Sequence, residues 1–149
     1  MDLIIALCGV KNVGKTTTLN KLIDLLSLIA DSYGIERLRE TRASFTIRGR
    51  KVAVCTPGDT KDIITDNISY FPDIDEYDVF VTASHTRGGT VEELESLAKK
   101  KDSKLIWIDK EDDKSKNPVI AAGLLGLIMQ GINKDFRNYL SKLKNKFSL

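Results

Sequence analysis

The chain has 149 residues, of which 42% are hydrophobic and 30% are charged, and its formal net charge is +2. This length fits one domain over residues 1–149 and is too short for two, and the composition is that of a soluble globular protein. Nucleic-acid binding is not indicated by so small a charge, and two cysteines are too few for a disulfide framework or a metal site. We therefore expect a cytoplasmic protein.

No apolar stretch of the sequence is long enough to cross a membrane. The longest stretch after the N-terminal one, residues 119–129, is interrupted by Gly123 and Gly126 and is shorter than the ~20 residues of a bilayer span. The N-terminal run lacks the positively charged residues that precede the apolar core of a signal peptide. We expect neither a membrane span nor a signal peptide.

The first predicted element is a strand at residues 2–8, where a nearly continuous apolar run is typical of a strand buried on both faces of a parallel sheet. The predicted helix after it carries apolar residues at helical spacing, namely Leu19, Leu22, Ile23, Leu26 and Ile29. Between the two, residues 9–17 read GVKNVGKTT and fit the phosphate-loop pattern G-x-x-x-x-G-K-[ST]. This arrangement predicts a phosphate site at the start of the helix.

The phosphate loop combines backbone and side-chain groups. Its glycines let the backbone curl until the NH groups face an anion, while the lysine and a hydroxyl reach the outer phosphates and a magnesium ion. The residues expected to bind the phosphates are Gly9, Asn12, Val13, Gly14, Lys15, Thr16 and Thr17. The alternative is a glycine turn that matches by chance, and it is disfavoured because every fixed position of the motif is filled.

Residues 35–42 form a charged stretch that contains Arg37, Arg39 and Arg42. From the composition we expect a solvated loop or a short helix. The alternative is a mobile segment over a bound nucleotide, from which an arginine offsets the charge of the phosphates. The residues that follow predict an antiparallel hairpin, because 43–47 and 51–55 alternate in polarity and are joined by a tight connection that contains Gly49.

The second hairpin strand ends in Cys55, Thr56, Pro57, Gly58 and Asp59. We expect this turn at the carboxyl end of the strand beside the phosphate-loop strand, where Asp59 directs a magnesium ion or a water molecule. The alternative is a type II turn that Pro57 and Gly58 supply, with no role in binding.

Residues 59–71 predict a helix and residues 77–83 a parallel strand. A capping box of Thr90 and Glu93 is expected to start the next helix. In the turn before it, Arg87 is the side chain that we expect to reach a phosphate, and an exposed loop arginine is the alternative. His85 is the only histidine, and a lone loop histidine is more often incidental than an acid or a base.

The last predicted strand covers residues 104–109, and Pro118 marks the start of a helix. An apolar stripe continues from Ile120 to Phe147, and Gly131 divides it into two candidate helices. Core packing is the simpler account of this stripe. The alternative is that its far end packs on a protein partner or on a second copy in a homodimer.

This order of elements, with a phosphate loop between the first strand and the first helix, resembles the P-loop NTPase superfamily. The resemblance covers most of the chain as topology and residues 9–17 as a specific motif. It implies an α/β fold with a three-layer P-loop NTPase sheet, mainly parallel with one antiparallel edge strand and with helices on both faces. It also implies that Lys15 contacts the beta- and gamma-phosphates and that Thr16 binds Mg²⁺.

Two branches of this superfamily compete. Residues 56–58 are similar to the tail of the D-x-x-G turn of GTPases, and residues 109–112 are similar to their N-K-x-D base-reading motif. The chain departs from the first motif at Cys55 and from the second at Asp109. Small ATP-dependent kinases and ATPases have less strict sequence requirements at these positions, and they tolerate a shifted carboxylate such as Asp59. ATP is therefore favoured over GTP.

We expect a protein that binds a magnesium nucleoside triphosphate and hydrolyses or transfers its gamma-phosphate. The catalytic residues are expected to be Lys15, Asp59 and Arg87, and the metal ligands Thr16 and Asp59. Two alternatives stay open: a GTPase-like protein, and a non-catalytic module whose bound nucleotide controls a protein partner.

Overall fold

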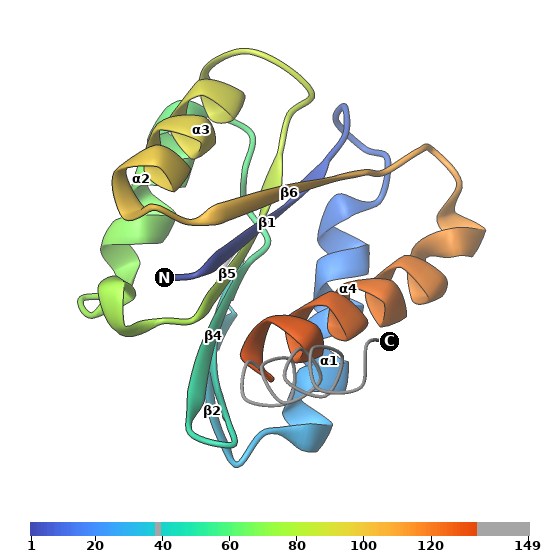
Figure 1. Cartoon of the computed structure of the whole chain (residues 1–149). Helices are drawn as coiled ribbons and strands as arrows, with labels where there is room; N and C mark the ends of the chain where they lie inside the picture. The colour runs from blue at the N-terminus through green and yellow to red at the C-terminus, as the bar shows by residue number, and fades with distance from the viewer. Residues whose placement is uncertain (38–39, 134–149) are drawn as a thin grey trace, which may run out of the picture.

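The computed structural model describes residues 1–37 and 40–133 and has an α/β fold in three layers (Figure 1). The strands are β1 (Leu3–Cys8), β2 (Ser32–Arg37), β3 (Thr41–Ile47), β4 (Arg50–Cys55), β5 (Val79–Ser84) and β6 (Lys104–Asp109). The α-helices of the described part are α1 (Lys15–Ile29), α2 (Lys61–Tyr70), α3 (Gly89–Lys101) and α4 (Asn117–Ile132), and two short 3₁₀ helices are η1 (Ile74–Glu76) and η2 (Lys114–Lys116).

The six strands form one mixed sheet in the order β2-β3-β4-β5-β1-β6. Strands β4, β5, β1 and β6 are parallel, whereas β3 is antiparallel to both of its neighbours, β2 and β4. The predicted α/β class and the predicted hairpin of β3 and β4 are confirmed. The prediction that the antiparallel strand forms an edge is wrong, because β2 lies outside β3.

Strand β2 occupies residues for which the sequence predicted a loop or a short helix. Its apolar side chains, Tyr33 and Ile35, lie opposite Phe45 and Ala43 of β3, and Ile35 packs against the core. An edge strand pairs on one side only, and charged residues are common there because they discourage further pairing. The charge of this stretch is therefore compatible with an edge strand, which composition alone does not distinguish from a loop.

Strand β1 is buried along its whole length, as its apolar run predicts. Leu3, Ile5 and Leu7 face one core with α1 and α4, whereas Ile4, Ala6 and Cys8 face the other core with α2 and α3. Figure 1 shows the two pairs of helices on opposite faces of the sheet. Because β1 is held between two layers and between β5 and β6, the loop that follows it starts from a fixed position.

The carboxyl ends of the parallel strands meet at one edge of the sheet, so the turns after β1, β4, β5 and β6 lie together. The sequence placed the turn at residues 55–59 next to the phosphate-loop strand, and this is wrong because β5 lies between β4 and β1. That turn still packs closely on β5: a Cβ on Gly58 would lie 1.9 Å from the carbonyl oxygen of Ala83. Only glycine fits this approach.

Helix α3 does not begin with the predicted capping box. Its N-cap is Gly88, without a side-chain capping bond, and Thr90 lies inside the first turn. The Thr90 hydroxyl instead accepts hydrogen bonds from the Ser84 hydroxyl (3.1 Å) and the His85 backbone NH (3.2 Å). Thr90 thus holds the turn between β5 and α3 rather than the end of the helix.

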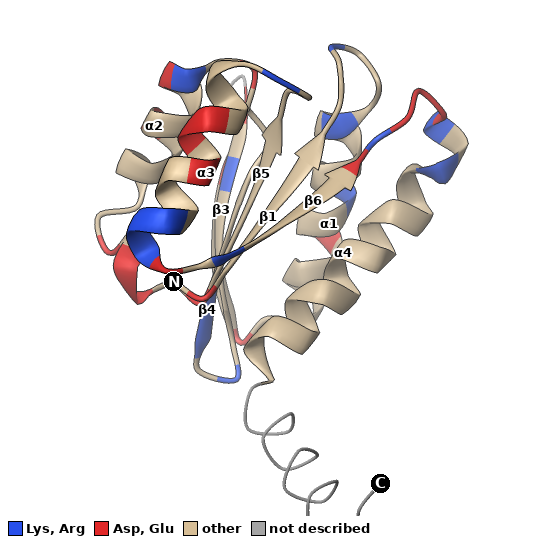
Figure 2. Ribbon diagram, turned by 45° about the horizontal axis from the view of Figure 1, so that its top comes forward, with Lys and Arg blue, Asp and Glu red and all other residues tan. Residues whose placement is uncertain are grey.

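Helix α4 starts with Pro118 in its first turn, as predicted, and continues to Ile132. It contains no Asp, Glu, Lys or Arg, and its ribbon is tan over this length in Figure 2. Residues 134–149, with the far part of the predicted stripe, lie outside the described residues, as does Arg39. No helix of the described part is long and apolar enough to span a membrane.

Candidate functional site

The phosphate loop joins β1 to α1 at the carboxyl edge of the sheet. Gly14 precedes the helix with a φ of 97°, a left-handed conformation that favours glycine, and the α1 residue Thr18 closes the first turn through bonds to the Gly14 carbonyl. Asn12 is also left-handed, with a φ of 66°, which asparagine tolerates better than most residues. The sequence is therefore compatible with a backbone that curls around the start of α1.

Lys15 is the central side chain of this site, and it is only 6% exposed. Its ammonium donates to the carbonyl oxygens of Gly9 (2.6 Å) and Ser84 (3.0 Å), and it lies 4.0 Å from Oδ1 of Asp59. Burial lowers the pKa of Lys15, because removal from water disfavours its charged form. One ammonium thus connects the turns that follow β1 and β4 with the last residue of β5.

A pocket of about 420 Å³ opens at this ammonium. Its lining comes from the phosphate loop, the start of α1 and three neighbouring segments, and consists of Lys11, Asn12, Gly14, Lys15, Thr16, Thr17, Glu40, Asp59 and Lys114. Among the remaining loop residues, Val13 is buried and Gly9 supplies its carbonyl to Lys15. The structure therefore brings Asp59 to the phosphate loop although β4 is not adjacent to β1.

Asp59 lies between two basic side chains. Its Oδ1 atom is 4.0 Å from Nζ of Lys15 and 3.7 Å from Nε2 of His85. From the sequence, His85 was expected to have no role in the site. Arg87, by contrast, is exposed and does not line the pocket. Of the two candidates in the turn after β5, the structure brings His85 to the site and leaves Arg87 outside it.

Glu40 and Lys114 line the pocket although the sequence did not predict either of them there, and Glu40 is the acidic one. It immediately precedes β3, and because β3 is antiparallel, this strand begins at the edge where the parallel strands end. Its Oε2 atom accepts a hydrogen bond of 2.9 Å from the hydroxyl of Thr56, in the turn after β4. The predicted hairpin was the signal that could have revealed it, since a hairpin returns to the edge from which it starts.

The donor set at this pocket suits a magnesium ion that arrives with phosphates. In the described part of the chain, no group of three His, Cys, Asp or Glu residues could hold a metal by itself. The pocket does combine the Thr16 hydroxyl with the carboxylate of Asp59. Mg²⁺ usually keeps several waters and binds one or two carboxylates together with substrate phosphates. These oxygen donors fit that pattern.

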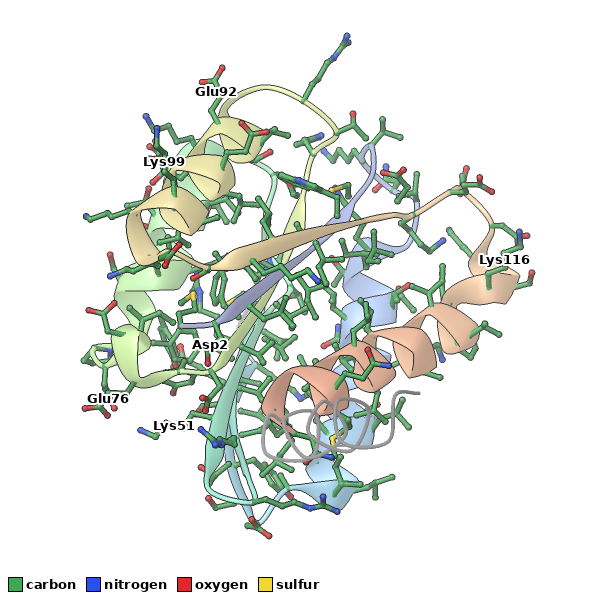
Figure 3. All side chains as sticks on the ribbon, in the orientation of Figure 1. Asp2, Lys51, Glu76, Glu92, Lys99 and Lys116 are labelled. Atoms are coloured by element: carbon green, nitrogen blue, oxygen red, sulfur yellow. The ribbon has the colours of Figure 1, made fainter. Side chains whose placement is uncertain are left out.

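The loop after β6, which resembles a base-reading motif, forms a separate feature. Lys110 is buried and its ammonium donates to the carbonyls of Glu111 (2.5 Å) and Asp113 (3.2 Å), so it holds the loop. Asp109 and Asp112 are exposed. A second pocket of about 210 Å³ lies here, lined by Asp109, Glu111, Asp113, Lys116 and Ile120. Figure 3 shows Lys116 beside the start of α4, far from Lys51 and Glu76.

Helix α4 contacts the phosphate loop through its first residue. Asn117 is 2% exposed, and a Cβ on Gly14 would lie 3.0 Å from its Nδ2 atom and 3.2 Å from its Oδ1 atom. Within the described residues, Oδ1 of Asn117 is a buried acceptor without a hydrogen-bond partner. Buried polar atoms in proteins are usually paired, so this unpaired oxygen is unusual.

The two described arginines of the charged stretch, Arg37 and Arg42, contact parts of the protein other than the pocket. Arg37 contacts α1 through Asn20 (3.2 Å) and Asp24 (3.4 Å). Arg42 donates to Oδ1 of Asn67 (2.9 Å) and lies 5.5 Å from the ring centroid of Tyr70. The hypothesis that an arginine of this stretch reaches the phosphates has no support from either residue.

No protein-family model, curated protein or solved structure matches this chain. No relative therefore supplies a substrate or a reaction, and what the chain binds must be inferred from its own residues.

Proposed function

We propose that this protein binds a magnesium nucleoside triphosphate, with ATP favoured over GTP, and cleaves or transfers the gamma-phosphate. The observation that carries the proposal is the buried ammonium of Lys15 at the base of a pocket formed by a G-x-x-x-x-G-K-[ST] loop and the N-terminus of α1. Backbone NH groups, the helix dipole and a lysine all favour an anion at the same place.

The lining of the pocket supports a polyanionic ligand. Apart from Gly14, every lining residue has a polar or charged side chain, and three of them are lysines: Lys11, Lys15 and Lys114. Pockets for organic small molecules are mostly apolar, whereas this one offers charge and hydrogen bonds. Phosphates, a metal ion and water match that chemistry.

Within this proposal, each residue has a role that follows from its position. Lys15 offsets the charge of the beta- and gamma-phosphates. Thr16 and Asp59 would hold Mg²⁺, which would supply further positive charge beside the phosphates. Catalysis is then mainly charge placement in a preformed site. Arg87 is given no role, because it is exposed and outside the pocket lining. ATP is favoured because Asp109 replaces the asparagine of the guanine-reading motif.

The second candidate function is a non-catalytic module whose bound nucleotide controls a protein partner. Helix α4 favours it: the helix contacts Gly14 through Asn117, has no charged residue, and leaves Val119 72% exposed. Steady release of phosphate would support the enzyme, and tight binding without turnover would support the module.

The test is calorimetry and thermal unfolding with Mg²⁺ and either ATP or GTP. A ligand that binds only the folded state raises its stability by about 2.7 kcal/mol at 100 times Kd, so the correct nucleotide should give the larger shift. Lys15→Ala should abolish the shift and leave the fold intact, whereas Lys21→Ala, at an exposed position of α1, should bind as the wild type does. A Lys15→Ala variant that still binds ATP normally would disprove the assignment.

A further inference from the structure

Glu40 differs from Asp59, the other carboxylate of the phosphate pocket. Asp59 has its Oδ1 atom near two basic groups, Lys15 and His85. Glu40 is exposed, and within the described part of the chain its one contact of this kind is the hydrogen bond from Thr56, with no basic partner. Glu40 is therefore a carboxylate of the pocket lining that no basic side chain of the described part neutralises.

From this difference we infer that Glu40 is the catalytic base that binds and deprotonates the attacking water, so that the acceptor of the gamma-phosphate is water. This inference rests on the proposed function and assigns one further residue to the same site. The lining agrees with it, since no lining residue has a hydrophobic side chain that would select an organic acceptor as a second substrate.

The proposed step conserves atoms and charge. The oxygen of the water bonds to the gamma-phosphorus, and the bond from that phosphorus to the bridging oxygen breaks, with the electron pair leaving on that oxygen. One proton of the water passes to the Glu40 carboxylate and then to solvent. The products are a nucleoside diphosphate and inorganic phosphate.

Thr56 is placed to position Glu40. It is 2% exposed, and its hydroxyl accepts from the backbone NH of Thr41 (2.8 Å) while it donates to Glu40. The same hydroxyl also lies 3.3 Å from the carbonyl oxygen of Thr41. If the Glu40 carboxylate moves toward a water in the pocket, the hydroxyl can donate to this carbonyl instead. Glu40 can therefore be released without leaving Thr56 unpaired.

The test compares phosphate release by the wild type and by Glu40→Gln, using the full chain with Mg²⁺ and ATP or GTP. Loss of a general base lowers kcat by about 10²–10⁴-fold. We expect such a loss for Glu40→Gln with unchanged nucleotide affinity in calorimetry. Glu36→Gln is the matched control, because Glu36 also accepts a hydroxyl bond, from Tyr70, but lies outside the pocket lining.

The proposed role of Thr56 is to position Glu40, and its test needs a measurement that a purely structural role of Thr56 would not affect. Thr56→Val should lower kcat in the wild type but add no further loss in Glu40→Gln, because the two residues act as a unit, and Thr56→Ser should restore the rate. An additional loss in the double variant would mean that Thr56 acts independently of Glu40.

The remaining outcomes separate the two levels of the proposal. A wild type that binds no triphosphate, or releases no phosphate, overturns the hydrolysis itself. A wild type that turns over while Glu40→Gln keeps the same kcat overturns only the assignment of Glu40. A Glu40→Gln variant whose rate recovers at high Mg²⁺ concentration makes Glu40 a metal ligand, which also overturns its assignment as the base.

Discussion

Gly58 connects the fold to the site, and its replacement by alanine tests both. Gly58→Ala places a Cβ 1.9 Å from the carbonyl oxygen and 2.3 Å from the carbonyl carbon of Ala83, whereas real Cβ atoms essentially never come closer than 3.0 Å. The obstacle is backbone of β5, so the turn has to move by about 1 Å. Such overpacking costs about 1–3 kcal/mol, which lowers Tm by roughly 2–12 °C in a chain of this size.

The same movement displaces Asp59, the next residue. A shift of about 1 Å in a positioned group can cost about 10²-fold in rate, so we expect phosphate release by Gly58→Ala to fall by about that factor. Thermal unfolding measures the first effect, and a steady-state phosphate assay measures the second. The assay has to be run below the lowered Tm, so that unfolded protein does not contribute.

Gly123→Ala is the matched control. Nothing lies within 4 Å of the Cβ that it would add, and Gly123 lies inside α4. Alanine is better than glycine in a helix by about 0.5–1 kcal/mol, so the same substitution should raise Tm here and leave turnover unchanged. If Gly58→Ala melted at the wild-type temperature and kept its activity, the turn after β4 would not pack on Ala83 as described.

Three further predictions concern individual side chains. Because burial lowers the pKa of Lys15, its ammonium loses its proton at a lower pH than an ordinary lysine, and triphosphate affinity should fall as pH rises through that pKa; calorimetry that finds constant affinity up to the usual lysine pKa would contradict this. Asn117→Ala removes a buried acceptor whose lack of a partner costs about 1–3 kcal/mol, so denaturant unfolding should show no loss of stability, and a clear loss would reveal a partner. Arg87→Ala should leave phosphate release unchanged, and a tenfold decrease would return Arg87 to the site.

The sequence predicted those parts of the fold whose signals are local. The apolar run of β1 and the helical spacing in α1 each follow from neighbouring residues, and both elements are present, with the G-x-x-x-x-G-K-[ST] residues between them. It did not predict that β5 lies between β4 and β1, because the order of strands in a sheet depends on contacts between distant segments. It missed β2 for a related reason: Tyr33 and Ile35 become apolar partners only opposite Phe45 and Ala43.

The site shows the same division between local and non-local information. Lys15 and Thr16 are defined by a contiguous motif, whereas the pairs Asp59 with His85 and Glu40 with Thr56 each join different turns. Charge content was a poor guide in the stretch around β2. Arg37 and Arg42 contact α1 and α2, whereas the acidic residue Glu40 lines the pocket.

The position of Glu40 could nevertheless have been inferred from the predicted hairpin. Strands β3 and β4 pair Ile47 with Arg50 and Arg42 with Cys55, and the next pair in this register is Thr41 with Thr56. The bond from the Thr56 NH to the Thr41 carbonyl (2.9 Å) continues that register, and Glu40 is the next residue outward, immediately before the start of β3. A predicted hairpin therefore has two ends of functional interest, because the residue before its first strand reaches the same edge as the turn after its second. In this protein both ends bring a carboxylate to the pocket that Lys15 lines.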